Sequence, residues 1–323
     1  MRPAITEASP GALAAPLFTD WQGKHAELWA NQAVRLQHRA HLLDLFSRDS
    51  LAELIDRYPR QHYALVHMGA QGDRRLWREG DLAGMPGHKV IEAIANGRMW
   101  LNLRRVSEVD RRFGALLDQI FAEVERRVPG YATFSRTSGI LISSPMAQVY
   151  YHSDLPGQSL WQIEGRKRVY VYPPKEPFLS GAQLENIALY GIEVDLAYEP
   201  WYDEHAEMFE IGPGEMLHWP LNAPHRVENL DCLNISMTTE YWTEAIRRRQ
   251  MVNLANGIMR NSLRLAPRSR TIAGPTFWAK AMLQAGVKRA GLLEKPRKAR
   301  RPIDFRLDPE HPGAIVDLAT AAE

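Results

Sequence analysis

The sequence predicts a mainly β core with helical extensions before and after it. Apolar residues recur at helical spacing before residue 129 and again after residue 242, and short β-rich runs separated by Gly, Pro, Asn and Asp fill the stretch between. Closely spaced strands with turns between them are typical of a sandwich or barrel. We therefore expect a mainly helical N-terminal extension at 1–135, a β core at 136–242, and a C-terminal helical extension and tail at 243–323.

The N-terminal extension is expected to begin with a loose arm, because its first residues include prolines and small side chains without periodicity. The last helix of this extension carries an apolar stripe along one face, and Pro129-Gly130 ends it. Helices are expected at 24–46, 50–58, 88–96 and 110–128, and a short strand at 62–68.

The β core is expected to contain short strands and one long insertion at 175–207. Further helices are predicted at 242–263 and 277–293, where apolar periodicity of the helical kind returns. The β-rich runs lie at 139–143, 148–153, 159–163, 168–172, 208–211, 215–219, 225–228 and 233–240.

The composition excludes several classes of protein. The chain has 323 residues, of which 45% are hydrophobic, and this rules out a disordered or collagen-like chain. Its 40 Lys and Arg against 38 Asp and Glu give a net charge of +2, which argues against a nucleic-acid binder. The single cysteine, Cys232, cannot form an intrachain disulfide, and we find neither a signal peptide nor an apolar run of ~18 residues. We therefore expect a soluble, cytoplasmic protein.

The residues that indicate chemistry begin with His152-Ser153-Asp154. Residues two apart in a strand point to the same face, so His152 and Asp154 can occupy neighbouring positions on one metal ion. His225 follows a Pro-containing turn, and a barrel can bring it beside this pair. Two histidines and one carboxylate form the facial triad of non-haem Fe(II) oxygenases. Taken alone, an HxD sequence is more often a core histidine and a turn aspartate, so the surrounding sequence has to decide.

The segment around His225 resembles the second cupin motif, G-x5-P-x-G-x2-H-x3-N. Gly214, Pro220, His225 and Asn229 hold their places in it. Asn222 stands for the central glycine, which is a mild change because asparagine tolerates a positive φ better than most residues.

The first cupin motif is recognisable from His152 to Gly165, with two departures. Asp154 replaces the second histidine, and Gln158 occupies the position of the usual glutamate ligand. Both departures change a four-ligand cupin site into a three-ligand site, which leaves coordination positions for a co-substrate and O2.

The following segment, residues 162–174, is similar to the JmjC branch of the Fe(II)- and 2-oxoglutarate-dependent oxygenases. That branch includes the asparaginyl hydroxylase of hypoxia-inducible factor and bacterial cupin-like proteins. The resemblance covers about 138–242 and implies a double-stranded β-helix. It also implies that His152, Asp154 and His225 bind Fe(II), and that the reaction consumes 2-oxoglutarate and O2.

The resemblance further implies which residues bind 2-oxoglutarate. Lys167 sits at the offset of the lysine that binds the distal carboxylate, and a dianion in a dry pocket requires such a cation. Gln158 lies where the family places an amide near the co-substrate. The family hydroxyl that assists the lysine is replaced by Val149, and Tyr150 is the candidate to supply a hydroxyl instead. Glu240 occupies a position where relatives often carry asparagine.

The leading hypothesis is an Fe(II)- and 2-oxoglutarate-dependent oxygenase that hydroxylates, or by the same chemistry demethylates, a protein or peptide side chain. The alternatives are a metal-dependent cupin enzyme that does not use 2-oxoglutarate, a small-molecule hydroxylase, and a non-catalytic regulatory protein with the same fold. An intact triad argues against the last alternative, and we expect neither a nucleic-acid nor a membrane partner. The apolar residues of the C-terminal helices predict a homodimer interface.

Overall fold

The computed structural model describes residues 15–68, 76–191, 196–291 and 302–318. Its strands are β1 (Val34–Gln37), β2 (Tyr63–His67), β3 (Arg78–Asp81), β4 (Met99–Leu103), β5 (Phe134–Ser143), β6 (Gln148–His152), β7 (Gly157–Glu164), β8 (Lys167–Val171), β9 (Glu207–Ile211), β10 (Glu215–His218), β11 (His225–Asn229), β12 (Asn234–Trp242), β13 (Ile303–Leu307) and β14 (Ile315–Asp317).

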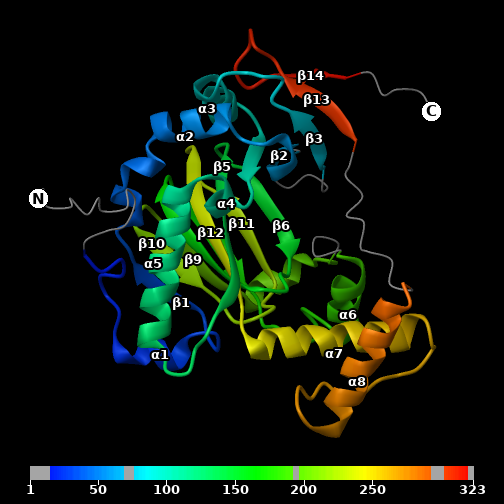
Figure 1. Ribbon diagram of the computed structural model, residues 1–323. Coiled ribbons are helices and arrows are strands. Elements are labelled where there is room, and N and C mark those ends of the chain that lie inside the picture. Colours follow the sequence, from blue (N-terminus) through cyan, green and yellow to red (C-terminus); the bar gives the residue numbers. More distant parts are fainter. Residues whose placement is uncertain (1–14, 69–75, 192–195, 292–301, 319–323) are drawn as a thin grey trace, which may run out of the picture.

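The helices surround these strands (Figure 1). The α-helices are α1 (Gly23–Leu28), α2 (Arg48–Asp56), α3 (Gly87–Asn96), α4 (Val106–Val109), α5 (Arg111–Arg127), α6 (Gly181–Tyr190), α7 (Glu244–Asn261) and α8 (Gly274–Arg289). The short 3-10 helices are η1 (Ala40–Leu42), η2 (Asp44–Phe46), η3 (Arg60–His62) and η4 (Pro200–His205). Within the described ranges, no helix combines the length and the hydropathy that crossing a bilayer requires.

The strands form two sheets that enclose a common core. The major sheet has ten strands in the order β1-β10-β7-β12-β5-β4-β2-β3-β13-β14, and the minor sheet has four in the order β6-β11-β8-β9. Leu160 and Leu217 of the major sheet pack with Val169, Val171 and Val227 of the minor sheet. This arrangement is a double-stranded β-helix with added strands and helices, so the predicted fold class is confirmed.

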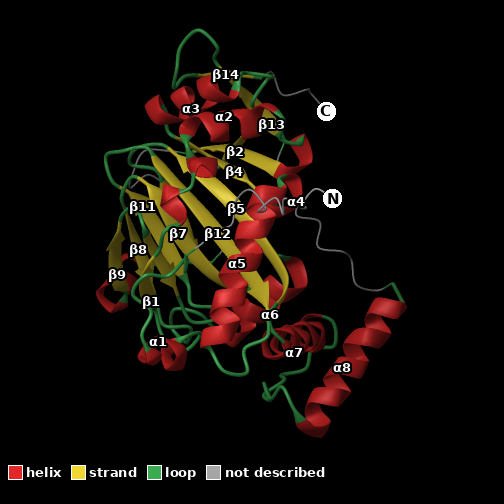
Figure 2. Cartoon of the chain, turned by 60° about the vertical axis from the view of Figure 1, so that its left-hand side comes forward, coloured by secondary structure: helices red, strands yellow, loops and turns green. Residues whose placement is uncertain are grey.

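Helices α2, α3 and α5 cover the opposite face of the major sheet (Figure 2). The longest of them, α5, agrees with the helix expected at 110–128. Asp110 caps it by accepting a hydrogen bond from the backbone N–H of Arg112 at 2.9 Å, and Arg126 and Arg127 in the last turn complement the helix dipole. Its apolar stripe packs on β5 and β12 in the largest hydrophobic cluster of the protein.

The N-terminal extension contains strands as well as its helices, and of these strands only β2 corresponds to one expected from the sequence. The helix expected at 24–46 ends at Leu28, and the chain continues as β1, in which the buried Val34 and Leu36 alternate with exposed residues. β1 pairs with β10, and β2, β3 and β4 extend the same sheet. The period of two along this stretch fits a sheet edge, and pairing with that edge overrides a weak local preference for helix.

The C-terminal tail also contributes strands. β13 pairs in parallel with β3 and antiparallel with β14, and its buried Phe305 and Leu307 alternate with more exposed residues. Among the described residues of 243–323, only α7 and α8 are helical, and β13 and β14 cover the edge of the N-terminal strands. An uncovered edge would leave backbone N–H and C=O groups unpaired.

The insertion between β8 and β9 packs on the outer face of the minor sheet. Its aromatic and aliphatic residues surround Tyr151 and Tyr172, whose side chains point away from the barrel interior. The carboxylate of Glu185 in α6 is fully buried and forms ion pairs with Arg260 of α7, at 2.7 Å, and with Arg270. These pairs connect the insertion to the C-terminal helices.

Candidate metal centre

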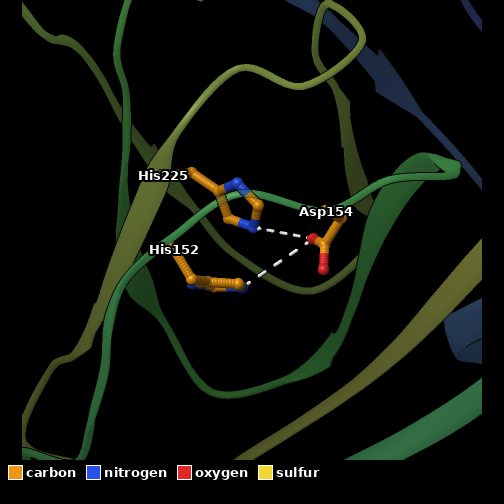
Figure 3. A group of neighbouring side chains, drawn as sticks. All are labelled: His152, Asp154 and His225. Carbon is orange, nitrogen blue, oxygen red and sulfur yellow. Dashed lines mark ion pairs between the residues drawn. The ribbon is translucent and has the colours of Figure 1, made fainter. Parts of the chain in front are cut away.

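His152 and His225 lie side by side on neighbouring strands of the minor sheet. β6 and β11 pair antiparallel with His152 directly opposite His225, and the centroids of their rings are 4.1 Å apart. The chain leaves β6 after His152, and Asp154 follows in the loop before β7. Its carboxylate points back toward both imidazoles (Figure 3).

The donor atoms of these three residues converge. The Oδ2 atom of Asp154 lies 3.3 Å from Nε2 of His225 and 3.8 Å from Nε2 of His152, and one ligand atom of each residue lies within 4.8 Å of the others. The exposed fraction of the side chain is 22% for Asp154, 14% for His152 and 3% for His225, so the cluster opens to solvent on the side of Asp154.

Backbone carbonyls fix the orientation of both imidazoles. Nδ1 of His152 bonds to the carbonyl oxygen of Tyr150 at 2.7 Å, and Nδ1 of His225 bonds to that of Ala223 at 3.0 Å. Because a carbonyl only accepts, each Nδ1 carries the proton and each Nε2 presents its lone pair to the cluster. A histidine that binds a metal ion through one ring nitrogen is usually supported by such a hydrogen bond from its other ring nitrogen.

The electrostatic environment keeps His225 neutral. Burial, and then the neighbouring His152, hold the pKa of His225 well below its usual range. A neutral imidazole is the form that binds a metal ion. Two imidazoles oriented by backbone carbonyls and one carboxylate therefore fit Fe(II), which takes this set of ligands in non-haem oxygenases.

Lys167 lies on the interior face of the same sheet. It opens β8, where Lys167, Val169 and Val171 alternate inward, and it pairs with Asn229, four residues after His225 on β11. Lys167 is 3% exposed, and its amine has neither a hydrogen bond nor an ion pair with any residue that the structure describes. Burial lowers the pKa of Lys167 to about 7.

Polar side chains surround the end of the barrel where Lys167 lies. The side-chain amide of Gln162 donates to Oδ1 of Asn234 at 2.7 Å and to the backbone oxygen of Gly165, and Ser236 donates to Oε1 of Gln162 at 2.8 Å. Asn229 donates to Ser143 at 2.8 Å. We did not select Gln162, Asn234 and Ser236 from the sequence, although their polar side chains at inward positions of buried strands are a signal that could have identified them.

The structure places the other candidate residues as follows. Gln158 shares the inward face of β7 with Leu160 and lies opposite Glu240 of β12, so both of these polar side chains are directed into the barrel. The hydroxyl of Tyr150 donates to the backbone oxygen of Leu76 at 3.0 Å, on the exposed side of β6. The roles of Gln158 and Tyr150 in binding a co-substrate stay predictions.

Two further histidines do not join the cluster. His218 of β10 is buried on the opposite face of the major sheet, where its ring stacks on Trp29 with centroids 4.0 Å apart. Its Nδ1 donates to the backbone oxygen of Gln158 at 2.8 Å, and its Nε2 accepts from the N–H of Ala30 at 3.2 Å. His205 is exposed at the end of η4. Within the part of the chain that the structure describes, only His152, Asp154 and His225 form a cluster that could hold a metal ion.

Two histidines and one aspartate converge inside a double-stranded β-helix, and the resemblance inferred from the sequence is confirmed at the level of the fold. Among solved structures, the chain is similar to that of Escherichia coli YcfD, with a TM-score of 0.51 and 18% identity over 90% of this chain and 74% of that chain. Another YcfD structure, described as a ribosomal oxygenase in complex with cobalt and 2-oxoglutarate, gives a TM-score of 0.47 and 17% identity over 87% of this chain and 72% of that chain. No protein-family model matches the chain, and no curated protein matches it in sequence.

Proposed function

We propose that the protein is an Fe(II)- and 2-oxoglutarate-dependent oxygenase. The observation that carries the proposal is the combination of two features in one barrel. One is the cluster of His152, Asp154 and His225, and the other is the buried amine of Lys167 on the same inner surface, which has no partner among the described residues. A buried cation without a partner is costly, so this amine indicates an anionic ligand.

Different residues of the chain would bind the metal ion and the co-substrate. Fe(II) would be held by Nε2 of His152, a carboxylate oxygen of Asp154 and Nε2 of His225. The carbonyls of Tyr150 and Ala223 would fix the two imidazoles. Lys167 would bind the distal carboxylate of 2-oxoglutarate among the polar side chains at its end of the barrel. When bound, Fe(II) and 2-oxoglutarate would supply the activation of O2 and the oxidation of a C–H bond, with release of succinate and CO2. The apolar layer of the core would exclude water from this region.

We further propose that the substrate is a protein or peptide side chain, which would be hydroxylated or, at an N-methyl carbon, demethylated. The support is the fold shared with YcfD, which is described as a ribosomal oxygenase. A cytoplasmic location is part of this proposal, and the free thiol of Cys232 is compatible with it.

The chain also offers a surface on which a second copy could dock. In both views α8 lies at the periphery, packed on α7 (Figures 1 and 2). It buries Phe277, Lys280 and Ala281 but leaves Trp278 58% and Met282 68% exposed, one turn apart on the same face. We propose this face as the interface of a homodimer, because exposed apolar patches of this kind mark interaction sites.

The oxygenase proposal is tested by adding Fe(II) and 2-oxoglutarate to the protein without O2. A visible charge-transfer band is expected for the wild type and for His205→Ala, a control at an exposed histidine, but not for His225→Ala. A wild-type protein that shows no such band and forms no succinate in air would contradict the proposal. A protein that binds Fe(II) but not 2-oxoglutarate would instead favour a metal-dependent cupin enzyme of another type.

A further inference from the structure

We propose that Asn222 and Ser153 are positioning residues that set the affinity of the metal centre by joining the loop of Asp154 to the turn that precedes His225. The inference rests on the proposed function only in taking His152, Asp154 and His225 as metal ligands. Neither residue contributes a ligand atom. Both lie next to the ligands in the sequence or in space, and both are buried, with 7% of Asn222 and none of Ser153 exposed.

Two hydrogen bonds connect the loop of Asp154 with the turn that precedes His225. The side-chain amide of Asn222 donates to the backbone oxygen of Asp154 at 2.6 Å. The hydroxyl of Ser153 donates in return to the backbone oxygen of Asn222 at 2.9 Å. The pair is reciprocal, and it links segments separated by 68 and 69 residues.

This connection is needed because Asp154 lies outside the sheet. His152 and His225 are held by the ladder between β6 and β11, in which they pair directly. Asp154 falls between the end of β6 at His152 and the start of β7 at Gly157, so no strand pairing fixes its backbone. The amide of Asn222 bonds to the carbonyl of Asp154 itself, so this hydrogen bond ties the backbone of the third ligand to the turn that precedes His225.

The conformation of Asn222 explains why this residue can make the bond. Its φ is +61°, in the left-handed region, within a turn closed by the N–H of Ala223 on the carbonyl of Pro220 at 3.0 Å. Glycine would adopt this φ without strain but has no side chain. Asparagine adopts it at small cost and adds an amide donor. The residue that departs from the glycine of the cupin motif thus acquires a contact that glycine cannot make.

The experiment measures Co(II) affinity in the absence of 2-oxoglutarate, by calorimetric titration and by the visible spectrum of bound Co(II). Asn222→Gly keeps the backbone conformation and removes the amide. Asn222→Asp keeps the shape and the tolerance for positive φ but has no N–H to donate. We expect both variants to bind Co(II) about 10- to 100-fold more weakly, as is typical when a supporting contact of a ligand is lost, and to show an altered Co(II) spectrum.

Asn31→Gly is the matched control, because the side-chain amide of Asn31 also donates to a backbone oxygen, that of Glu27, but at an exposed position, and it should leave Co(II) affinity within about twofold. Circular dichroism establishes that each variant is folded. If either Asn222 variant fails to fold, Ser153→Ala provides the same test through the other bond. Folded variants that bind Co(II) as the wild type does, with an unchanged spectrum, would overturn the inference. A wild-type protein that binds Co(II) but not 2-oxoglutarate would instead overturn the proposed function and leave the inference about Asn222 and Ser153 standing.

Discussion

His152 and His225 lie directly opposite each other on β6 and β11, with ring centroids 4.1 Å apart, although they are 73 positions apart in the chain. The register of one pair of strands therefore brings two imidazoles to one point. A shift of the pairing by one residue would direct one of them out of the barrel.

Lys167→Ala should lower the affinity for 2-oxoglutarate roughly 10- to 100-fold, which is the size expected for losing a hydrogen bond to a charged group. Co(II) affinity should not change, because Lys167 is four residue pairs away from the histidine pair along β11. Titration of Co(II)-loaded protein with 2-oxoglutarate measures the effect. Lys89→Ala is the control, since Lys89 is exposed and pairs with its neighbour Glu92. Equal affinities for the wild type and Lys167→Ala would contradict the assignment.

Binding of 2-oxoglutarate should take up a proton above pH 7. Burial lowers the pKa of Lys167 to about 7, so the amine is charged below that pH and increasingly neutral above it. A bound carboxylate favours the charged form and raises the pKa again. The affinity should therefore fall as pH rises above 7, by up to about tenfold per unit. Calorimetry at pH 8 in buffers of different ionisation enthalpy detects the proton, and the absence of uptake would contradict this prediction.

The free energy of unfolding should rise with pH between about 4 and 6.5. Burial lowers the pKa of His218 to about 4 and that of His38 to about 3, whereas both have their ordinary pKa of 6.5 when unfolded. In this window the unfolded chain binds more protons, so each histidine contributes a slope of up to about 1.4 kcal/mol per pH unit. Urea unfolding at several pH values should give a shallower slope for His218→Gln than for the wild type. Asn31→Gln, at an exposed position without a titratable side chain, should leave the slope unchanged.

Glu185→Ala should destabilise the junction between the insertion and the C-terminal helices. It removes a fully buried carboxylate from Arg260 and Arg270, whose side chains are 36% and 40% exposed. Because water can reach both guanidinium groups, we expect a loss of about 2 kcal/mol, below the roughly 3–5 kcal/mol of a fully buried pair. Urea denaturation and limited proteolysis near α6 measure it. Glu244→Ala is the control: it breaks exposed pairs with Arg247 and Arg248 and should lower the free energy of unfolding much less than Glu185→Ala.

Trp278→Glu should shift the protein toward the monomer if α8 forms the homodimer interface. A charge at the centre of an apolar contact opposes its burial. Light scattering at several protein concentrations measures the mass. Leu42→Glu is the control, because Leu42 is 69% exposed on a different part of the chain. A wild-type protein that is monomeric at all concentrations would remove the proposal.

Local patterns in the sequence were sufficient to predict the β core, the α5 helix and the identity of the clustered residues. The spacing of His152 and Asp154, and the motif around His225, depend on the period of a strand and on one tight turn. Both are properties of a few consecutive residues, and so they can be read without knowing the fold. The position of Lys167 on an inward face follows from the same alternation.

Contacts between segments that are distant in the sequence determined the remaining features of the fold and the site. By itself, the sequence predicted which residues could bind a metal ion and which could bind a dianion. Only the tertiary structure decided that the segment after Leu28 is the strand β1, that β13 returns to β3, and that the insertion packs outside the minor sheet. It also decided that the amide of Asn222 bonds to the carbonyl of Asp154. The reason is physical: an edge strand, a buried ion pair or a hydrogen bond across 68 residues is stabilised by a partner that the local sequence does not contain.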